Sequence, residues 1–389
     1  MDYYKDIFPD RPYLEDLDLR SFPESPAYII DEQALERNLE ILKEIKDKTD
    51  CKILLALKAF SNYKTFPLIK KYLDGCCASS LWEAQLAYEE FGKEVHTYSP
   101  SYRSDELNQI SSYSNHIIFN SVQELKRYKA SLKGTELGLR INPEHSETDV
   151  ELYNPCSKFS RLGAKLADLE GLDIDAISGF HLHTLCQKGA DALERTLAVF
   201  EEKFHKFLPK LKWLNLGGGH HITQVGYDKD LLMRLINKLK TKYDLQVYLE
   251  PGEAVAINTG SLLCTVLDTF ESAGIHHAIV DISATCHMPD VLEMPYRPDI
   301  RGAGEEGQKK FSYRLGGTSC LAGDSIGIYS FEEELKRGDR LLFDDMSHYT
   351  MVKTSFFNGV RHPSIYLKDK SRRDVLLKKF TYEDYRSKL

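Results

Sequence analysis

Short apolar segments alternate with longer amphipathic ones through the first two-thirds of the chain. Eight apolar segments have strand length: Ile53–Phe60, Gly75–Ser80, Glu94–Pro100, His116–Ser121, Glu136–Pro143, Ile177–Thr184, Trp213–Gly219 and Leu245–Glu253. Helical spacing of apolar residues marks stretches between them, such as Tyr63–Leu73, Leu81–Phe91, Ser121–Leu132, Ala190–Leu208 and Lys229–Tyr243. Alternating strands and helices pair in parallel through right-handed crossovers. Because a barrel of eight such units takes about 250 residues, the pattern predicts an α/β fold with a (β/α)8 TIM-type barrel over residues 32–254. A doubly wound open sheet is the alternative.

The pattern changes after residue 254. The segments are now strand-like and separated by turn residues, as in Ser261–Glu271, His276–Ile282, Arg340–Met346 and Ser364–Lys368. We therefore expect a C-terminal β-rich domain over residues 255–389. Ala27–Asp31 is also strand-like, so residues 1–31 are expected to pack with that domain.

Composition is that of a folded enzyme, with 389 residues, 42% hydrophobic and 28% charged. No uncharged apolar run is long enough to span a membrane. The N-terminal segment carries acids where a secretion signal needs basic and then apolar residues, and the eight cysteines lack metal-type spacing, so we expect a cytoplasmic protein with reduced thiols. The net charge of −8, without a basic cluster, argues against nucleic acid or anionic lipid as partners.

In a barrel of this kind the chemistry gathers at the carboxyl ends of the strands. Lys58 ends the first apolar segment, where removal from water would lower its pKa and suit it to covalent chemistry with a carbonyl group. The alternative is a lysine that extends into solvent. Gly217–Gly219 follow another strand, and their amides suit a phosphate, although glycines also serve plain turns.

His181 and His183 alternate along a strand, so both rings face one way. Zinc enzymes use such a pair, but further ligands are not evident in the sequence, so we expect no metal. A histidine that stacks on a flat cofactor, or one that is satisfied in the core, are the other interpretations. Glu250 ends the eighth strand and can pair with a protonated ring nitrogen. Together with Lys58 and the glycines, these residues predict a pyridoxal 5'-phosphate site.

Two segments of the second domain also stand out. Gly316–Gly327 contains Cys320 and Asp324 in a loop bracketed by glycines, which indicates an exposed functional turn. Asp345–Gly359 brings Tyr349 close in sequence to two phenylalanines and an asparagine. An ordinary aromatic core is the alternative for the second segment.

The order of these features resembles one known family. It is that of the fold-type III decarboxylases that depend on pyridoxal phosphate, a group with alanine racemase, ornithine decarboxylase and diaminopimelate decarboxylase. The resemblance spans about residues 25–365. Within the group, Glu250–Val255, His287–Pro298 and Ser347–Ile365 most resemble the carboxynorspermidine/carboxyspermidine decarboxylases of bacterial polyamine biosynthesis.

This resemblance implies roles for individual residues. Lys58 would bind the cofactor covalently, and His183 would stack on its ring. Gly217–Gly219 and Tyr349 would hold its phosphate. Glu250 would pair with its ring nitrogen, where alanine racemase has an arginine, so decarboxylation is favoured over racemisation.

The resemblance also implies roles for two residues at the edges of the site. Arg161 resembles an arginine near the phenolic oxygen of the cofactor. Cys320 would enter the active site of the neighbouring subunit and return a proton to the substrate, which implies a homodimer with shared sites. The ornithine and diaminopimelate enzymes have arginine where this chain has Glu253, and an acid where it has Leu321. Substrate recognition must therefore differ from theirs.

The resemblance thus implies decarboxylation of carboxynorspermidine, carboxyspermidine or both. The ammonium groups of such a substrate call for acids, and Glu253, Asp290 and Asp324 are the candidates, unless they are solvated surface acids. A decarboxylase of diaminopimelate, lysine or ornithine, a non-catalytic homologue and a metal-dependent hydrolase are the alternatives.

Overall fold

A computed structural model describes residues 17–148 and 150–389. Residues 1–16, which begin the expected N-terminal segment, lie outside the described residues. The chain divides into two compact units. One is Arg37–Val255, and the other combines the residues up to Glu36 with Ala256–Leu389.

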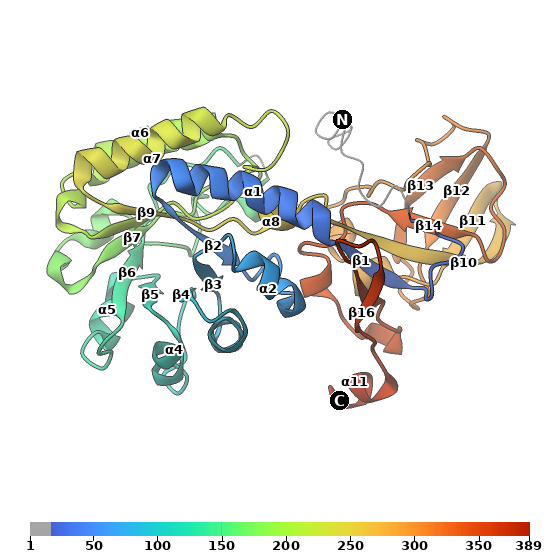
Figure 1. Cartoon of the computed structure of the whole chain (residues 1–389), viewed down its shortest axis with the longest axis horizontal. Coiled ribbons are helices and arrows are strands. Elements are labelled where there is room, and N and C mark those ends of the chain that lie inside the picture. Colours follow the sequence, from blue (N-terminus) through green and yellow to red (C-terminus); the bar gives the residue numbers. More distant parts are fainter. Residues whose placement is uncertain (1–16, 149) are drawn as a thin grey trace. The chain divides into compact units, whose positions relative to one another are not determined.

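Arg37–Val255 contains a closed barrel of eight strands (Figure 1). In order around the barrel they are β2 (Lys52–Ala56), β3 (Gly75–Ala78), β4 (Glu94–Tyr98), β5 (His116–Phe119), β6 (Glu136–Arg140), β7 (Gly179–His181), β8 (Trp213–Asn215) and β9 (Gln246–Leu249). All neighbours are parallel, and β9 closes the ring by pairing with β2. Each strand lies within one of the eight apolar segments or begins one residue before it, so the predicted (β/α)8 barrel is confirmed.

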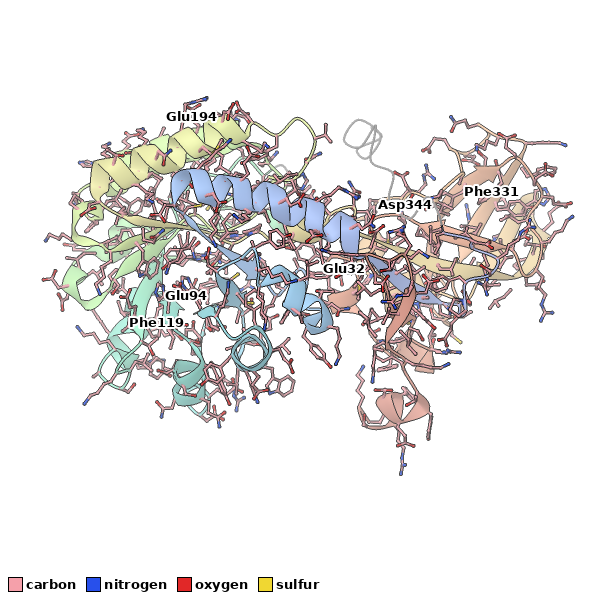
Figure 2. All side chains as sticks on the ribbon, in the orientation of Figure 1. Glu32, Glu94, Phe119, Glu194, Phe331 and Asp344 are labelled. Atoms are coloured by element: carbon pink, nitrogen blue, oxygen red, sulfur yellow. The ribbon has the colours of Figure 1, made fainter. Side chains whose placement is uncertain are left out.

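Helical segments connect the strands. They are α1 (Glu32–Thr49), η1 (Tyr63–Thr65), α2 (Phe66–Ile69), α3 (Leu81–Leu86), η2 (Ala87–Phe91), α4 (Leu107–Tyr113), α5 (Val122–Tyr128), η3 (Glu151–Tyr153), η4 (Leu166–Leu169), η5 (Ile174–Ala176), α6 (Ala190–Phe204), η6 (Leu208–Lys210), α7 (Lys229–Tyr243) and α8 (Glu253–Ala256). In α6, Leu197 and Phe200 are buried, whereas Glu194 lies on the exposed face (Figure 2). The described residues between β6 and β7 form only the short turns η3–η5, so this crossover has no α-helix.

A large aromatic side chain fills part of the barrel interior. Trp213 of β8 is buried, and its indole lies against Gly138 of β6 and Gly179 of β7. A Cβ atom would lie 2.4 Å from the indole at Gly138 and 2.0 Å from it at Gly179. The two glycines therefore make the room that the tryptophan needs.

The other unit is built on an eight-stranded sheet in the order β13-β12-β11-β10-β1-β15-β16, with β14 paired to β10. The strands are β1 (Ala27–Asp31), β10 (Gly260–Ser272), β11 (Ile275–Val280), β12 (Phe311–Gly316), β13 (Ser325–Phe331), β14 (Arg340–Phe343), β15 (Ser364–Lys368) and β16 (Asp374–Lys378). The short helical segments are α9 (Ala284–His287), α10 (Asp290–Glu293), η7 (Met351–Lys353), η8 (Phe357–Gly359) and α11 (Tyr382–Arg386). The predicted β-rich domain after the barrel is therefore confirmed, and β1 from the N-terminal segment pairs with β10 and β15.

In residues 17–148 and 150–389, every helix is too short or too polar to cross a membrane.

Candidate active site

Lys58 lies two residues beyond the end of β2, at the carboxyl end of the barrel. Its Nζ atom is 3.5 Å from Nε2 of His183, which follows β7. Lys58 is exposed as a residue, although His183 lies close to its ammonium group. The loss of hydration lowers the pKa of Lys58, and the nearby guanidinium of Arg140 acts in the same direction. A larger fraction of this amine is therefore neutral than of a lysine in water.

Two contacts fix the orientation of His183. The backbone amide of Gly218 donates a hydrogen bond of 2.9 Å to Nδ1, and the guanidinium of Arg140 donates one of 3.0 Å to the His183 carbonyl oxygen. Burial lowers the pKa of His183 well below its usual value, so the ring is neutral. Since Nδ1 accepts, the ring proton lies on Nε2, the atom that faces Lys58.

The glycine loop after β8 requires its three glycines. Gly217 and Gly219 have positive φ angles of 69° and 81°. Added Cβ atoms would lie 2.6 Å from His183 at Gly217, 2.3 Å from the Glu250 carbonyl oxygen at Gly218, and 1.9 Å from a backbone oxygen at Gly219. The loop therefore packs directly against the backbones that carry His183 and Glu250.

This packing also occupies two of the amides that were expected to face a phosphate. The Gly217 amide donates 2.8 Å to Oδ1 of Asn215, and the Gly218 amide donates to His183. Among the described residues, the amide of Gly219 donates to no protein group and is left for a ligand. The predicted phosphate site thus depends on fewer loop amides than the sequence suggested.

Glu250 directly follows β9 and is a buried carboxylate with two donors. Nε2 of His181 lies 2.9 Å from Oε2, and Nδ2 of Asn215 lies 2.7 Å from Oε1. Burial raises the pKa of Glu250, but the electrostatic attraction of His181 and the hydrogen bonds from His181 and Asn215 outweigh that effect and hold the pKa below the usual range. Burial lowers the pKa of His181, so this ring donates as a neutral imidazole. Glu250 is ionised and can hold a proton on a partner nitrogen.

Sequence reasoning missed Arg140 and Asn215, which help to arrange the site. Arg140 ends β6, is buried, and lies with its guanidinium 4.7 Å from the ring centre of Tyr98. Both residues could have been selected from the sequence, because each one ends an apolar strand of the barrel. Arg161 has an exposed side chain, and its carbonyl oxygen accepts from Asn120 at 2.9 Å. Arg140 is therefore the better placed of the two arginines beside Lys58 and His183.

Glu253 lies three residues after Glu250, at the first position of α8. Its side chain is 15% exposed. Oε1 accepts a hydrogen bond of 2.8 Å from Nε2 of Gln187 and lies 3.5 Å from Nε2 of His221. The Gln187 amide thus helps to hold this carboxylate near the same end of the barrel.

The second unit holds Cys320 in a constrained loop. The thiol is free and the residue exposed, and its backbone amide donates 2.7 Å to Oδ1 of Asn358. Asp324 supports the loop from within, because Oδ2 accepts from the hydroxyl groups of Ser319 at 2.6 Å and Ser283 at 2.8 Å. These contacts favour a structural role for Asp324 over the predicted contact with substrate.

Two further predicted residues belong to this unit. Asp290 is the first residue of α10 and forms an ion pair with Lys353, so its charge is already compensated. Tyr349 is partly buried and has a φ angle of 48°, a conformation that is uncommon for residues other than glycine. Such strain is frequent at ligand-binding positions.

The family model "Pyridoxal-dependent decarboxylase, C-terminal sheet domain" matches residues 27–347. The chain belongs to the pyridoxal-dependent decarboxylases, and the family resemblance seen in the sequence is confirmed. Members of this family are enzymes, so the enzyme prediction is confirmed as well.

Individual relatives match over nearly the full chain. The chain is 48% identical to the carboxyaminopropylagmatine decarboxylase of Synechocystis sp., covering 97% of this chain and 98% of the relative. It is 44% identical to the carboxynorspermidine/carboxyspermidine decarboxylase of Campylobacter jejuni, covering 93% and 97%. The crystal structure of Campylobacter jejuni carboxynorspermidine decarboxylase with norspermidine is similar at a TM-score of 0.88, with 42% identity over 94% of this chain and 100% of that chain.

Proposed function

We propose that this enzyme binds pyridoxal 5'-phosphate and decarboxylates carboxynorspermidine, carboxyspermidine or both. The observation that carries the proposal is the ionised Glu250, held by His181 and Asn215 at the barrel end that presents Lys58. Relatives named for carboxylated polyamines support the substrate class.

The cofactor would be held by residues already described. Lys58 would bind it covalently, His183 would stack on its ring, and Glu250 would pair with its ring nitrogen. The Gly219 amide and Tyr349 would hold its phosphate. When bound, pyridoxal phosphate supplies an electron sink for the electron pair that remains after CO2 leaves.

The protein residues contribute proton control around that step. Glu250 stays ionised and so keeps a proton on the nitrogen it faces. The neutral His183 carries its Nε2 proton toward the Lys58 amine. The Cys320 thiol would give a proton to the substrate carbon that lost CO2. Because the thiol is exposed in its own unit, we propose that it acts in the active site of a partner subunit. The enzyme would then be a homodimer, and we propose that it works in the cytoplasm.

Glu253 is the acid that we assign to substrate recognition. Its carboxylate accepts a hydrogen bond from the Gln187 amide, is 15% exposed and lies three residues beyond Glu250. An ammonium group of a polyamine tail would form a charge-assisted hydrogen bond with this carboxylate. Asp290 would bind the substrate more weakly, because the substrate would have to compete with Lys353 for this carboxylate.

Carboxyaminopropylagmatine is the second candidate substrate, because the relative named for it is 48% identical over 97% of the chain. It ends in a guanidinium group, whereas the carboxylated triamines end in a primary ammonium. A planar guanidinium forms bidentate bonds with one carboxylate, so the two tails make different demands on the site.

CO2 release tests the proposal directly. The protein, loaded with pyridoxal phosphate, is assayed with carboxynorspermidine, carboxyspermidine, carboxyaminopropylagmatine, diaminopimelate, lysine and ornithine. We expect kcat/KM for a carboxylated triamine to exceed that for the three amino acids by at least about a hundred-fold, the effect of losing one or two charged hydrogen bonds. Preference for carboxyaminopropylagmatine would favour the second candidate, and turnover of none of the six would contradict both.

A further inference from the structure

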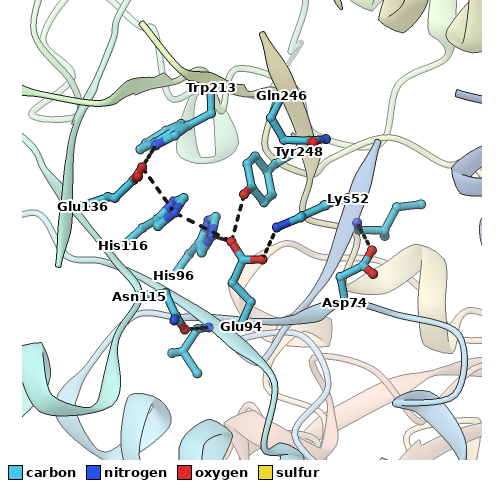
Figure 3. Close-up of polar contacts among 12 residues, drawn as sticks. Lys52, Asp74, Glu94, His96, Asn115, His116, Glu136, Trp213, Gln246 and Tyr248 are labelled. Carbon is cyan, nitrogen blue, oxygen red and sulfur yellow. Dashed lines mark hydrogen bonds and ion pairs between the residues drawn. The ribbon is translucent and has the colours of Figure 1, made fainter. Parts of the chain in front are cut away.

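A second polar cluster lies inside the barrel at the amino ends of the strands, opposite the end that carries Lys58 (Figure 3). His96 of β4 is directly opposite His116 of β5 in the strand register, and His116 is directly opposite Glu136 of β6. Glu94 lies two residues before His96 and so on the same face of β4. Three adjacent strands therefore present four metal-ligating side chains together.

Most groups of this cluster are well partnered. Oε1 of Glu94 is 2.9 Å from Nε2 of His96 and accepts from the Tyr248 hydroxyl at 2.8 Å, and Oε2 accepts from Lys52 at 2.7 Å. Glu136 accepts from the indole nitrogen of Trp213 at 2.9 Å. The two imidazole rings stack with centroids 3.9 Å apart.

Both histidines have an unsatisfied ring nitrogen, since Nδ1 of His96 and Nδ1 of His116 are buried without a hydrogen-bond partner among the described residues. The His116 side chain is 8% exposed. Its Nε2 atom lies 3.7 Å from Oε1 of Glu94 and 3.7 Å from Oε2 of Glu136. These separations are too long for hydrogen bonds. They are close to the ~3.5 Å between two ligand atoms that each bind one tetrahedral Zn²⁺ at about 2.0–2.2 Å.

We propose that Glu94, His96 and His116 form a binding site for a first-row divalent cation, represented here by Zn²⁺. Their ligand atoms all lie within 4.8 Å of one another. Imidazole nitrogen and carboxylate oxygen are donors that suit Zn²⁺, and Glu136 is placed to supply a fourth ligand. The sequence suggested no such site, because the ligands come from three separate strands without a spacing motif.

The site has a route to solvent and a means of balancing charge. A cavity of about 640 Å³ is lined by Glu94, His116 and Glu136, together with Lys52 and loop residues. A bound cation would compete with the Lys52 ammonium for Glu94. Because the Lys52 side chain is 41% exposed, it can move into water when the cation binds.

The first test uses the wild-type chain with its cofactor. After treatment with a chelator, the protein is titrated with ZnCl₂ by calorimetry, and the zinc-edge X-ray absorption spectrum is recorded at one equivalent. We expect one saturable site per chain and a nitrogen/oxygen shell with two imidazoles. A first shell that contains sulfur would place the ion on a cysteine and overturn the proposal, as would the absence of saturable binding.

Variants then assign the ligands. His116→Gln should weaken Zn²⁺ binding by at least about a hundred-fold, since even changes to groups behind the ligands cost ten- to a hundred-fold. His205→Gln is the matched control, because His205 is exposed at the end of α6, and it should bind Zn²⁺ like the wild type. Unchanged affinity in His116→Gln would contradict the assignment. If that variant does not fold, the absorption spectrum of the wild type decides alone.

Discussion

The Nε2 atom of His181 lies 2.9 Å from the Oε2 atom of Glu250, and both side chains are buried in the barrel. The two residues are 69 positions apart in the chain; His181 ends β7, and Glu250 directly follows β9. Asn215 donates to the other carboxylate oxygen from β8. Glu250 is thus ionised because two neighbouring strands supply donors, although it is removed from water.

The pH profile of the enzyme should report this relationship. His181→Leu removes one donor from the ionised form of Glu250 and so raises its pKa. Because the ionised form is required, activity is lost as the pH falls through that pKa. The acid limb of kcat/KM should therefore move to higher pH by about 1–2 units, since a hydrogen bond to a charged group is worth roughly 1.5–3 kcal/mol.

His181→Gln is the control for that experiment, because glutamine can still donate to the carboxylate. It should shift the acid limb less than His181→Leu does. Profiles that superimpose on the wild type for both variants would show that His181 does not position Glu250.

Glu253→Gln tests how the polyamine tail is bound. The change keeps the shape and the contact with Gln187 but removes the charge. KM for carboxynorspermidine should rise about ten- to a hundred-fold, the effect of one lost charged hydrogen bond. The cofactor absorbance should not change. Glu170→Gln, at an exposed position of the same unit, serves as the control, and an unaltered KM in Glu253→Gln would remove Glu253 from the substrate site.

Asn358→Gly tests how the Cys320 loop is held. Glycine removes the acceptor of the Cys320 amide and tolerates the φ angle of 55° at this position. Because small misplacements of a reacting group are costly, we expect kcat to fall by about ten- to a hundred-fold. Asn358→Asp keeps an acceptor oxygen and should lose less. Full turnover by the glycine variant would mean that the loop needs no such anchor.

Mixing two inactive variants tests the shared site. If Cys320 acts in the partner subunit, a heterodimer of Lys58→Ala and Cys320→Ala chains contains one intact site. Activity should then return after the subunits exchange, to at most a fraction of the wild-type value. Exchange demonstrated by mass spectrometry without any recovery of CO2 release would argue for a site built within one chain.

The barrel and the barrel end that carries Lys58 could be predicted because each depends on local patterns. Apolar segments become strands, and their carboxyl ends converge, so Lys58, His183 and Glu250 could be assigned to one place. Contacts between distant segments could not be predicted. The pairing of Asp290 with Lys353 spans 63 positions, and nothing in either segment indicates the other.

Arg140 and Arg161 also show that contacts between distant segments could not be predicted. Arg161 was selected by resemblance to a motif, but its side chain is exposed. Arg140 lies at a strand end beside the partly buried Tyr98 and donates to the His183 carbonyl oxygen, a contact that forms only when β6 and β7 pair. Burial and strand pairing therefore identify Arg140, which the sequence alone did not single out.

CO2 release from carboxynorspermidine by Lys58→Ala tests the central claim most directly. The variant and the wild type are both incubated with pyridoxal phosphate, and Lys64→Ala, which changes an exposed lysine of η1, is the control. We expect the wild type and Lys64→Ala to release CO2 and to absorb in the visible or near ultraviolet, and Lys58→Ala to lose that absorbance and nearly all turnover while remaining folded. Normal CO2 release by folded Lys58→Ala would contradict the account.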